Sequence, residues 1–190
     1  MNQEKMQKAV RDFLVAVGED PDREGLKETP RRVCGYWAEL LQGMQYSNEQ
    51  IAKMYGKVFY TKSDPLVIKH VQNVYSHCEH HLALMYNMSV TVAYLPQKTD
   101  KGFKVIGLSK IPRIVEMCAK RLQLQEKLAE DIAECIMLAT GSNDVYVYIV
   151  ADHACVSARG AKSDGKTSVT HLEGAFISNS TLRAEVERKI

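Results

Sequence analysis

The sequence predicts an α+β protein with an antiparallel sheet, and two changes of pattern along the chain indicate it. Up to about residue 57, apolar residues recur at helical spacing. From Val58 onward, short runs rich in β-branched and aromatic residues predict strands, and two helical segments interrupt them near 110–122 and 124–138. Strands and helices segregated in this way favour two long helices packed on one face of the sheet. We therefore divide the chain into an N-terminal helical region, residues 1–57, and a second domain, residues 58–190.

The first region should hold three helices. Apolar spacing predicts a helix over 3–17 that ends at Gly18. Thr29-Pro30 should start the second, because threonine can accept a hydrogen bond from a free N–H and proline suits the first helical position. A shorter helix should follow Ser47, which forms a capping-box pattern with Gln50.

The second domain should open and close with strands. Pro96 ends one predicted strand, and the polar residues 97–102 predict a turn, so that Val105-Ile106 would return as the second strand of a hairpin. Ser109 should cap the first long helix, and Gln125-Glu126 should open the next. A short helix over 181–189 should close the chain. The predicted strands are 58–60, 66–71, 88–95, 105–106, 145–150 and 166–170.

Composition limits the classes of function. The 190 residues are 45% hydrophobic and 25% charged, with a net charge of +2, which is too small to predict nucleic acid as the main partner. No apolar run is long enough to span a membrane, and the polar N-terminus does not resemble a signal peptide. We expect a cytoplasmic protein with no membrane partner.

The strongest chemical signal is Cys78-Glu79-His80-His81. Cys78 and His81 stand three residues apart, a spacing that lets both side chains reach one metal ion, and Cys155 beside His153 offers a third ligand. Three ligands would leave a position open for water and favour a catalytic metal. His70, His77 or His171 could instead complete a structural site, and the cysteines could be core residues without any metal.

Other residues offer proton transfer and anion binding. His80 and His153 each adjoin a proposed ligand and could move protons near neutral pH. Ser109-Lys110 and Arg113 combine a helix start with two cations, which indicates an anion site, and Arg159 adds a cation near the metal. Gln125 and Glu126 have capping and surface roles by default, but the pair could also hydrogen-bond a purine edge.

Six motifs are spread from the first helical region to the C-terminal half. They are Glu19-Asp-Pro-Asp-Arg-Glu-Gly-Leu26, Glu28-Thr-Pro-Arg-Arg-Val33, Ser76-His-Cys-Glu-His-His81, Ile106-Gly-Leu-Ser-Lys110, Arg121-Leu-Gln-Leu-Gln-Glu126 and His153-Ala-Cys-Val-Ser-Ala-Arg-Gly160. With these motifs in this order, the chain resembles the GTP cyclohydrolase I family.

The resemblance implies a fold, an assembly and a reaction. The fold would be the tunnelling fold (T-fold), in which sheets of several subunits close into a barrel with active sites between subunits. The assembly would be a homodecamer of two pentamers. The reaction would be the zinc-dependent opening of the imidazole ring of GTP, release of formate, and reclosure to 7,8-dihydroneopterin triphosphate. That product belongs to tetrahydrofolate and pterin biosynthesis.

The resemblance also implies residue roles. Cys78, His81 and Cys155 would bind one Zn²⁺ per subunit, with His80 and His153 as the acid–base pair. Substrate would be held at guanine, ribose and triphosphate by one further set of side chains. This set comprises Gln125 and Glu126 at guanine, Ser109 at the ribose or phosphate end, and Lys110, Arg113, Arg159 and Arg32 at the triphosphate.

Departures from the family pattern fall in loops. Ala83-Leu84 replaces a common Val-Pro pair, the stretches 82–90 and 97–104 are longer, and Lys127 replaces an arginine. Rival interpretations are a nitrile reductase or a pyruvoyl-tetrahydropterin synthase of the same fold, and a non-catalytic, zinc-stabilised assembly module. The Cys/His/Cys set with Gln125-Glu126 disfavours both enzymes.

Overall fold

The N-terminal 42 residues form a separate compact unit. The computed structural model describes residues 1–190, and their contacts divide them into Met1–Gln42 and Gly43–Ile190. In the first unit, α1 (Gln3–Ala16) and α2 (Thr29–Leu40) contact each other and bury Leu14 and Cys34. Thr29 is the first residue of α2 rather than its cap. Glu28 holds the cap position without a side-chain hydrogen bond.

The third helix belongs to the second unit. In α3 (Asn48–Tyr55), Ser47 and Gln50 form the predicted capping box, because this motif depends only on residues three positions apart. Ile51 and Ala52 are buried in the main core, so α3 packs with the sheet domain. The predicted division at residue 57 follows the change of sequence period, whereas the compact units divide before α3.

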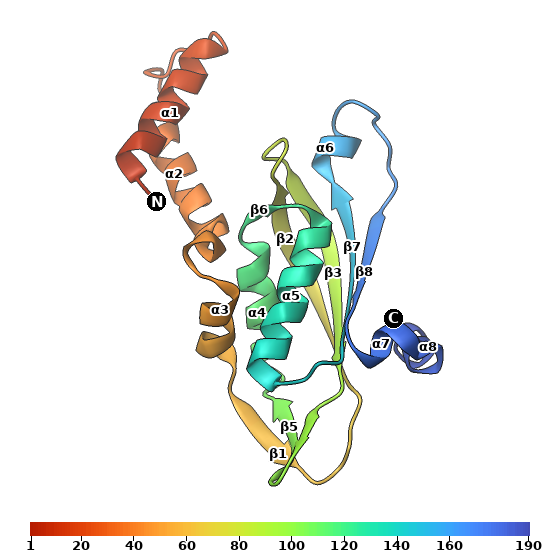
Figure 1. The fold of residues 1–190 in the computed structure, drawn as a ribbon. Helices are drawn as coiled ribbons and strands as arrows, with labels where there is room; N and C mark the ends of the chain where they lie inside the picture. The colour runs from red at the N-terminus through yellow and green to blue at the C-terminus, as the bar shows by residue number, and fades with distance from the viewer. The chain divides into compact units, whose positions relative to one another are not determined.

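The main sheet has five strands in the order β6-β2-β3-β7-β8 (Figure 1). Four of them pair antiparallel, as predicted, but β6 pairs parallel with the end of β2, so the sheet is mixed. The two residues of β6 are too few to produce a periodic signal, which is why the sequence pattern missed this strand. The strands are β2 (Val67–Cys78), β3 (Leu84–Tyr94), β6 (Leu122–Gln123), β7 (Val145–His153) and β8 (Thr167–Leu172).

Alternating side chains of the sheet serve two cores. Val92 and Val147 face the core that contains α4 (Lys110–Ala119) and α5 (Gln125–Thr140), which lie on one face of the sheet. Their neighbours in sequence face the opposite way, toward the smaller core around Phe176. That core includes α7 (Ala175–Ser178) and α8 (Ser180–Glu187). None of the helices has both the length and the apolar character that a membrane-spanning segment needs.

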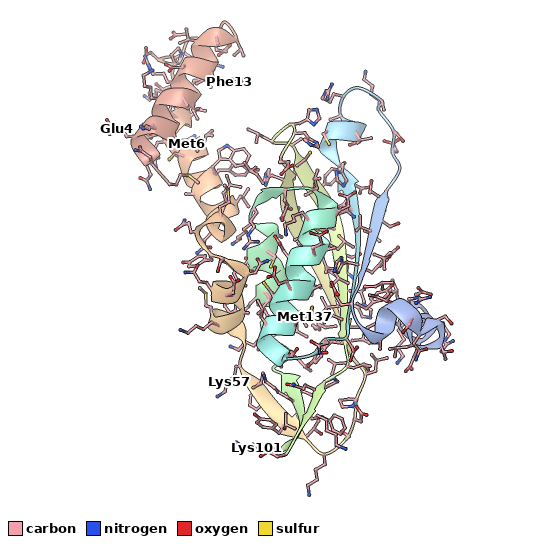
Figure 2. The ribbon with its side chains drawn as sticks, viewed as in Figure 1. Glu4, Met6, Phe13, Lys57, Lys101 and Met137 are labelled. Atoms are coloured by element: carbon pink, nitrogen blue, oxygen red, sulfur yellow. The ribbon has the colours of Figure 1, made fainter.

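A returning strand follows Pro96 as predicted, but it does not pair with the strand that Pro96 ends. Val105 and Ile106 lie in β5 (Gly102–Ile106), which pairs with β1 (Val58–Thr61) and β4 (Gln97–Thr99) in a second, three-stranded sheet. The polar turn is therefore shorter than predicted. Lys101 of this turn lies over the ring of Tyr60. Figure 2 labels Lys101 at the tip of the small sheet.

A buried ion pair connects the start of the second unit to α5. Asp131 exposes only 5% of its side chain and accepts hydrogen bonds from Arg121, Lys127 and Asn48. Arg121 also donates to the carbonyl groups of Gly43 and Tyr46. Burial alone would raise the pKa of Asp131. The hydrogen bonds from Lys127 and Asn48 and the nearby positive charges outweigh burial and hold its pKa below the ordinary value.

Replacing Asp131 with alanine is expected to destabilise the fold by about 3 kcal/mol, because Arg121, whose side chain is only 14% exposed, would lose the carboxylate that balances its charge. The folded-state pKa of Asp131 is lowered, so its contribution is present above the unfolded pKa and is lost as pH falls through the folded pKa. The difference between wild type and variant should therefore shrink below about pH 4. Urea unfolding at fixed protein concentration and several pH values measures it.

Glu130→Ala is the matched control. Glu130 lies on the same helix, but its side chain is 53% exposed and its partner Lys127 is 3.6 Å away. Its loss should change the free energy of unfolding by less than about 0.5 kcal/mol. Equal losses from both variants, or a difference that grows on acidification, would contradict the role of Asp131.

Candidate metal centre and active site

A tight turn at the end of β2 positions Cys78 and His81. Cys78 is the last residue of β2, which extends well beyond the predicted 66–71. The turn is closed by hydrogen bonds from Cys78 N–H to the Ala83 carbonyl (2.9 Å) and from Glu79 N–H to the Gln123 carbonyl (3.3 Å). Leu82 has a positive φ of 53°, which reverses the chain. As a result, His81 folds back beside Cys78.

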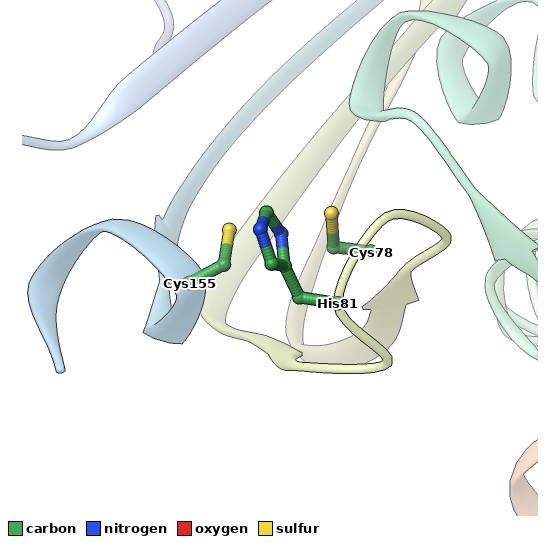
Figure 3. Close-up of side chains that lie close together, drawn as sticks. All are labelled: Cys78, His81 and Cys155. Carbon is green, nitrogen blue, oxygen red and sulfur yellow. The ribbon is translucent and has the colours of Figure 1, made fainter. Parts of the chain in front are cut away.

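The third residue of the cluster, Cys155, follows a strand on the other side of β3. His153 ends β7, and Cys155 follows in the short helix α6 (Ala154–Ser157). Because Met85 of β3 pairs with both Ser76 and His153, the ends of β2 and β7 meet at the same edge of the sheet. The ligand atoms of Cys78, His81 and Cys155 all lie within 4.8 Å of one another (Figure 3). The three predicted ligands thus converge on one point and could hold a metal ion.

The histidines that could have completed a structural site lie elsewhere. His70 is eight residues upstream along β2 and bonds Thr91, and His171 on β8 bonds Glu173. His77 is buried and directly precedes Cys78 in β2. Because consecutive residues of a strand point to opposite faces of the sheet, the His77 side chain points away from that of Cys78. No other His, Cys, Asp or Glu joins the cluster. Two thiols and one imidazole fit a tetrahedral metal that keeps one coordination position free.

The charges around the cluster also suit a cation. Burial raises the pKa of the Cys155 thiol, and the adjacent Cys78 raises it further. Both cysteines can therefore be thiolates together only when a positive charge lies beside them. Arg159 Nη1 lies 3.0 Å from His81 Nε2, so the arginine donates a hydrogen bond to this ring nitrogen. The other ring nitrogen of His81, Nδ1, does not take part in this contact. Arg159 is therefore beside the metal cluster, close to where the sequence placed it.

The two proposed acid–base histidines have different environments. His80 is exposed and its Nε2 is 4.0 Å from Glu79 Oε1. His153 is half-buried, and its Nε2 lies 2.7 Å from Gln125 Oε1. Burial lowers the pKa of His153, while the charges of Glu126 and Asp152 act in the opposite direction. His153 is thus the more firmly held of the pair.

The predicted anion-binding residues lie away from the cluster. Ser109 precedes α4, Lys110 begins it and Arg113 lies in its first turn, beside β5 and Lys57. The other end of α4 leads to β6 and hence to Cys78 (Figure 1). The ten residues of α4 span about 15 Å. Within one chain, α4 therefore separates these cations from the cluster. Arg32 is exposed on α2 in the N-terminal unit.

Gln123 and the surroundings of Asp152 were not singled out by the sequence. Gln123 is buried in β6 and donates to Ser76 Oγ (3.0 Å) and the Cys118 carbonyl (2.8 Å), which holds β6 against β2. The alternation Leu-Gln-Leu-Gln before a helix is the signal that could have revealed it. Beyond His153, a cavity of about 160 Å³ is lined by Tyr86, Asp152 and Ser157, among others.

An α+β domain with two thiols and two imidazoles gathered at one edge of its sheet has the make-up of a metal-dependent enzyme. The chain belongs to the GTP cyclohydrolase I family, whose sequence model matches residues 6–190. The resemblance recognised in the motifs is therefore confirmed. The chain is an enzyme of the hydrolase class.

Named relatives cover nearly the whole chain. It is 46% identical over 183 residues to GTP cyclohydrolase 1 of Clostridium acetobutylicum, covering 93% of this chain and 91% of the relative. It is 48% identical over 175 residues to GTP cyclohydrolase 1 of Clostridium botulinum, covering 88% and 86%. Among solved structures, the apo archaeosine synthase QueF-Like is 21% identical, with a TM-score of 0.48 over 60% of this chain and 98% of the other.

Proposed function

We propose that this chain is a GTP cyclohydrolase I, which hydrolyses the imidazole ring of GTP, releases C8 as formate and recloses the product as 7,8-dihydroneopterin triphosphate. The net reaction consumes one water. The observation that carries the proposal is the convergence of Cys78, His81 and Cys155 in a chain that belongs to this family. His153 beside the cluster supplies the proton-transfer group that a purely structural metal site would not need.

We assign one Zn²⁺ per subunit to the cluster, held by Cys78, His81 and Cys155. Two sulfur ligands and one nitrogen ligand are the donor types zinc prefers, and the three side chains already lie within coordinating reach. When bound, the ion would supply Lewis acidity and a water of lowered pKa. The protein contributes the fixed turn after β2 and the charge of Arg159.

The residues of this chain then bind the nucleotide and move its protons. His153 and His80 would exchange protons with the imidazole ring nitrogens of GTP, and the lowered pKa of His153 leaves it neutral at pH 7 and able to accept one. Glu126, exposed at the start of α5, would accept from guanine N–H groups, with Gln125 beside it. Lys110, Arg113, Arg159 and Arg32 would hold the triphosphate, and Ser109 would contact the ribose or phosphate end.

The reaction itself is tested by incubating purified protein with GTP and measuring formate together with the fluorescence of the oxidised pterin, with and without a chelator. We expect both products in equal amounts and their loss on chelation. Metal-replete protein that produces neither would overturn the proposed function. This assay also separates the enzyme from a zinc-stabilised assembly module.

Replacing His153 with asparagine is expected to lower kcat by roughly 100- to 10,000-fold, the usual contribution of a positioned acid–base group. The metal content should be unchanged because His153 is outside the ligand set. Steady-state kinetics and elemental analysis measure the two quantities. His171→Asn is the matched control, since His171 bonds Glu173 on β8 and should leave kcat unchanged. Full activity of His153→Asn would remove His153 from the mechanism.

We further propose that the T-fold assembles into a decamer of two pentamers through its open strand edges. β8 pairs only with β7, and residues 67–71 of β2 pair only with β3, so two long edges carry unpaired backbone groups. Pairing of β8 with β2 of a neighbouring subunit would close these edges into a barrel. It would also bring cations of one subunit to the cluster of another. In this proposal residues 58–190 form the catalytic domain, and the N-terminal helical region contributes Arg32.

A further inference from the structure

Both ends of the Gln125 side chain are engaged inside the chain. Gln125 is the first residue of α5 and is only 2% exposed. Its Nε2 donates to the carbonyl oxygens of Ile149 on β7 and Thr167 on β8, each at 3.1 Å. Its Oε1 lies 2.7 Å from His153 Nε2. The amide therefore joins α5 to two strands and to the histidine at once.

These contacts fix which way the amide points. If the oxygen and nitrogen of Gln125 were exchanged, an amide oxygen would face two carbonyl oxygens at 3.1 Å, and no donor would stand between them. The observed orientation is the one that satisfies all three neighbours. It places an acceptor, Oε1, against His153 Nε2, so this ring nitrogen must donate.

We propose that Gln125 is a positioning residue, whose amide holds His153 as the tautomer that carries hydrogen on Nε2 and leaves Nδ1 as the reactive nitrogen. Because Nε2 is engaged by the Gln125 amide, Nδ1 is the ring nitrogen left to face a bound molecule. Nδ1 makes no hydrogen bond within the chain. The tautomer is independent of the substrate, whereas its catalytic consequence rests on the function proposed above.

The alternative is that Gln125 binds guanine directly, as the family resemblance implies. Both amide hydrogens are engaged, so guanine could meet the amide only at the second lone pair of Oε1, on a side chain that is only 2% exposed. The adjacent Glu126, by contrast, is exposed. The two roles therefore predict different effects of the same substitution.

The tautomer is tested by solid-state ¹⁵N NMR of protein labelled at histidine, with His153→Asn identifying the His153 signals. In the wild type we expect a protonated Nε2 and a bare Nδ1. Gln125→Leu, which removes the acceptor that faces Nε2, should lose this preference. Gln123→Leu removes a second buried amide of the same segment and should leave the His153 signals unchanged. A bare Nε2 in the wild type would overturn the proposal, whatever the variants do.

Kinetics then separate positioning from substrate binding. Gln125→Leu should lower kcat by roughly 10- to 100-fold, as for groups that orient a functional histidine, with KM for GTP changed less than about 3-fold. A raised KM with unchanged kcat would assign Gln125 to substrate instead. If the wild type turned over no GTP, the proposed function would fail, yet the NMR result would still decide the tautomer.

Discussion

Replacing Cys78 with alanine is expected to remove the bound metal and to lower GTP turnover by roughly 1000-fold or more. Cys78 is one of only two thiols in the cluster and is buried at the end of β2, and no other His, Cys, Asp or Glu joins the cluster. The metal's charge and its bound water each contribute several kcal/mol to such reactions, and about 4 kcal/mol corresponds to roughly 1000-fold. Elemental analysis and formate release measure the two losses.

The matched control is Cys34→Ala. Cys34 is also buried, but it lies on α2 in the N-terminal unit, near the Gln3 carbonyl and outside the cluster. The Cys34→Ala protein should keep one metal ion per subunit and its GTP turnover. Circular dichroism would show whether each variant is folded. A Cys78→Ala protein that retained a full complement of metal would remove Cys78 from the ligand set, and one that lost the metal but kept turnover would show that the reaction does not need it.

Two inactive variants are expected to regain activity when they assemble together. Lys110 and Arg113 lie at the opposite end of α4 from β6 and Cys78, so we place them in the site formed with a neighbouring subunit's cluster. Cys78→Ala damages one half of each site, and Lys110→Ala/Arg113→Ala damages the other. In random mixed oligomers with equal numbers of both, roughly one quarter of the sites would combine two intact halves.

The experiment uses co-expression with two different affinity tags and purification on both. Activity near one quarter of the wild type is the expected result. A mixture of Cys78→Ala with His153→Asn serves as the control and should stay inactive, because both residues lie in the same half. If mixed oligomers form but remain as inactive as their parents, the cations act within their own chain or not at all.

Local features of the fold could be predicted from the sequence, whereas features that depend on distant partners could not. The capping box at Ser47 and Gln50 and the start of α5 at Gln125 depend on residues a few positions apart. The partner of the strand that returns after Pro96 was predicted wrongly, because the same polar turn is compatible with two pairings, one with the strand that Pro96 ends and one with β4 and β1. The choice between them depends on β1, which lies some 40 residues upstream of β5.

The metal cluster was predictable for a different reason. Cys78 and His81 are close in sequence, and a third ligand beside His153 was the simplest complement. The role of Gln125 was not predictable, since it depends on where the carbonyl groups of Ile149 and Thr167 come to lie. The ion pair of Arg121 and Asp131 was not predictable either, because each residue taken alone resembles an ordinary surface charge.

The stretch from Arg121 to Gln125 places every second side chain in an internal hydrogen-bond network. Arg121 contacts Asp131, Gln123 contacts Ser76, near the end of β2, and Gln125 contacts His153, while Leu124 between them is exposed. One inserted or deleted residue would reverse this alternation beyond its position and turn Gln125 away from the histidine. The length of this stretch is therefore under as strict a constraint as its chemistry, so natural variants should differ here by substitution and not by insertion.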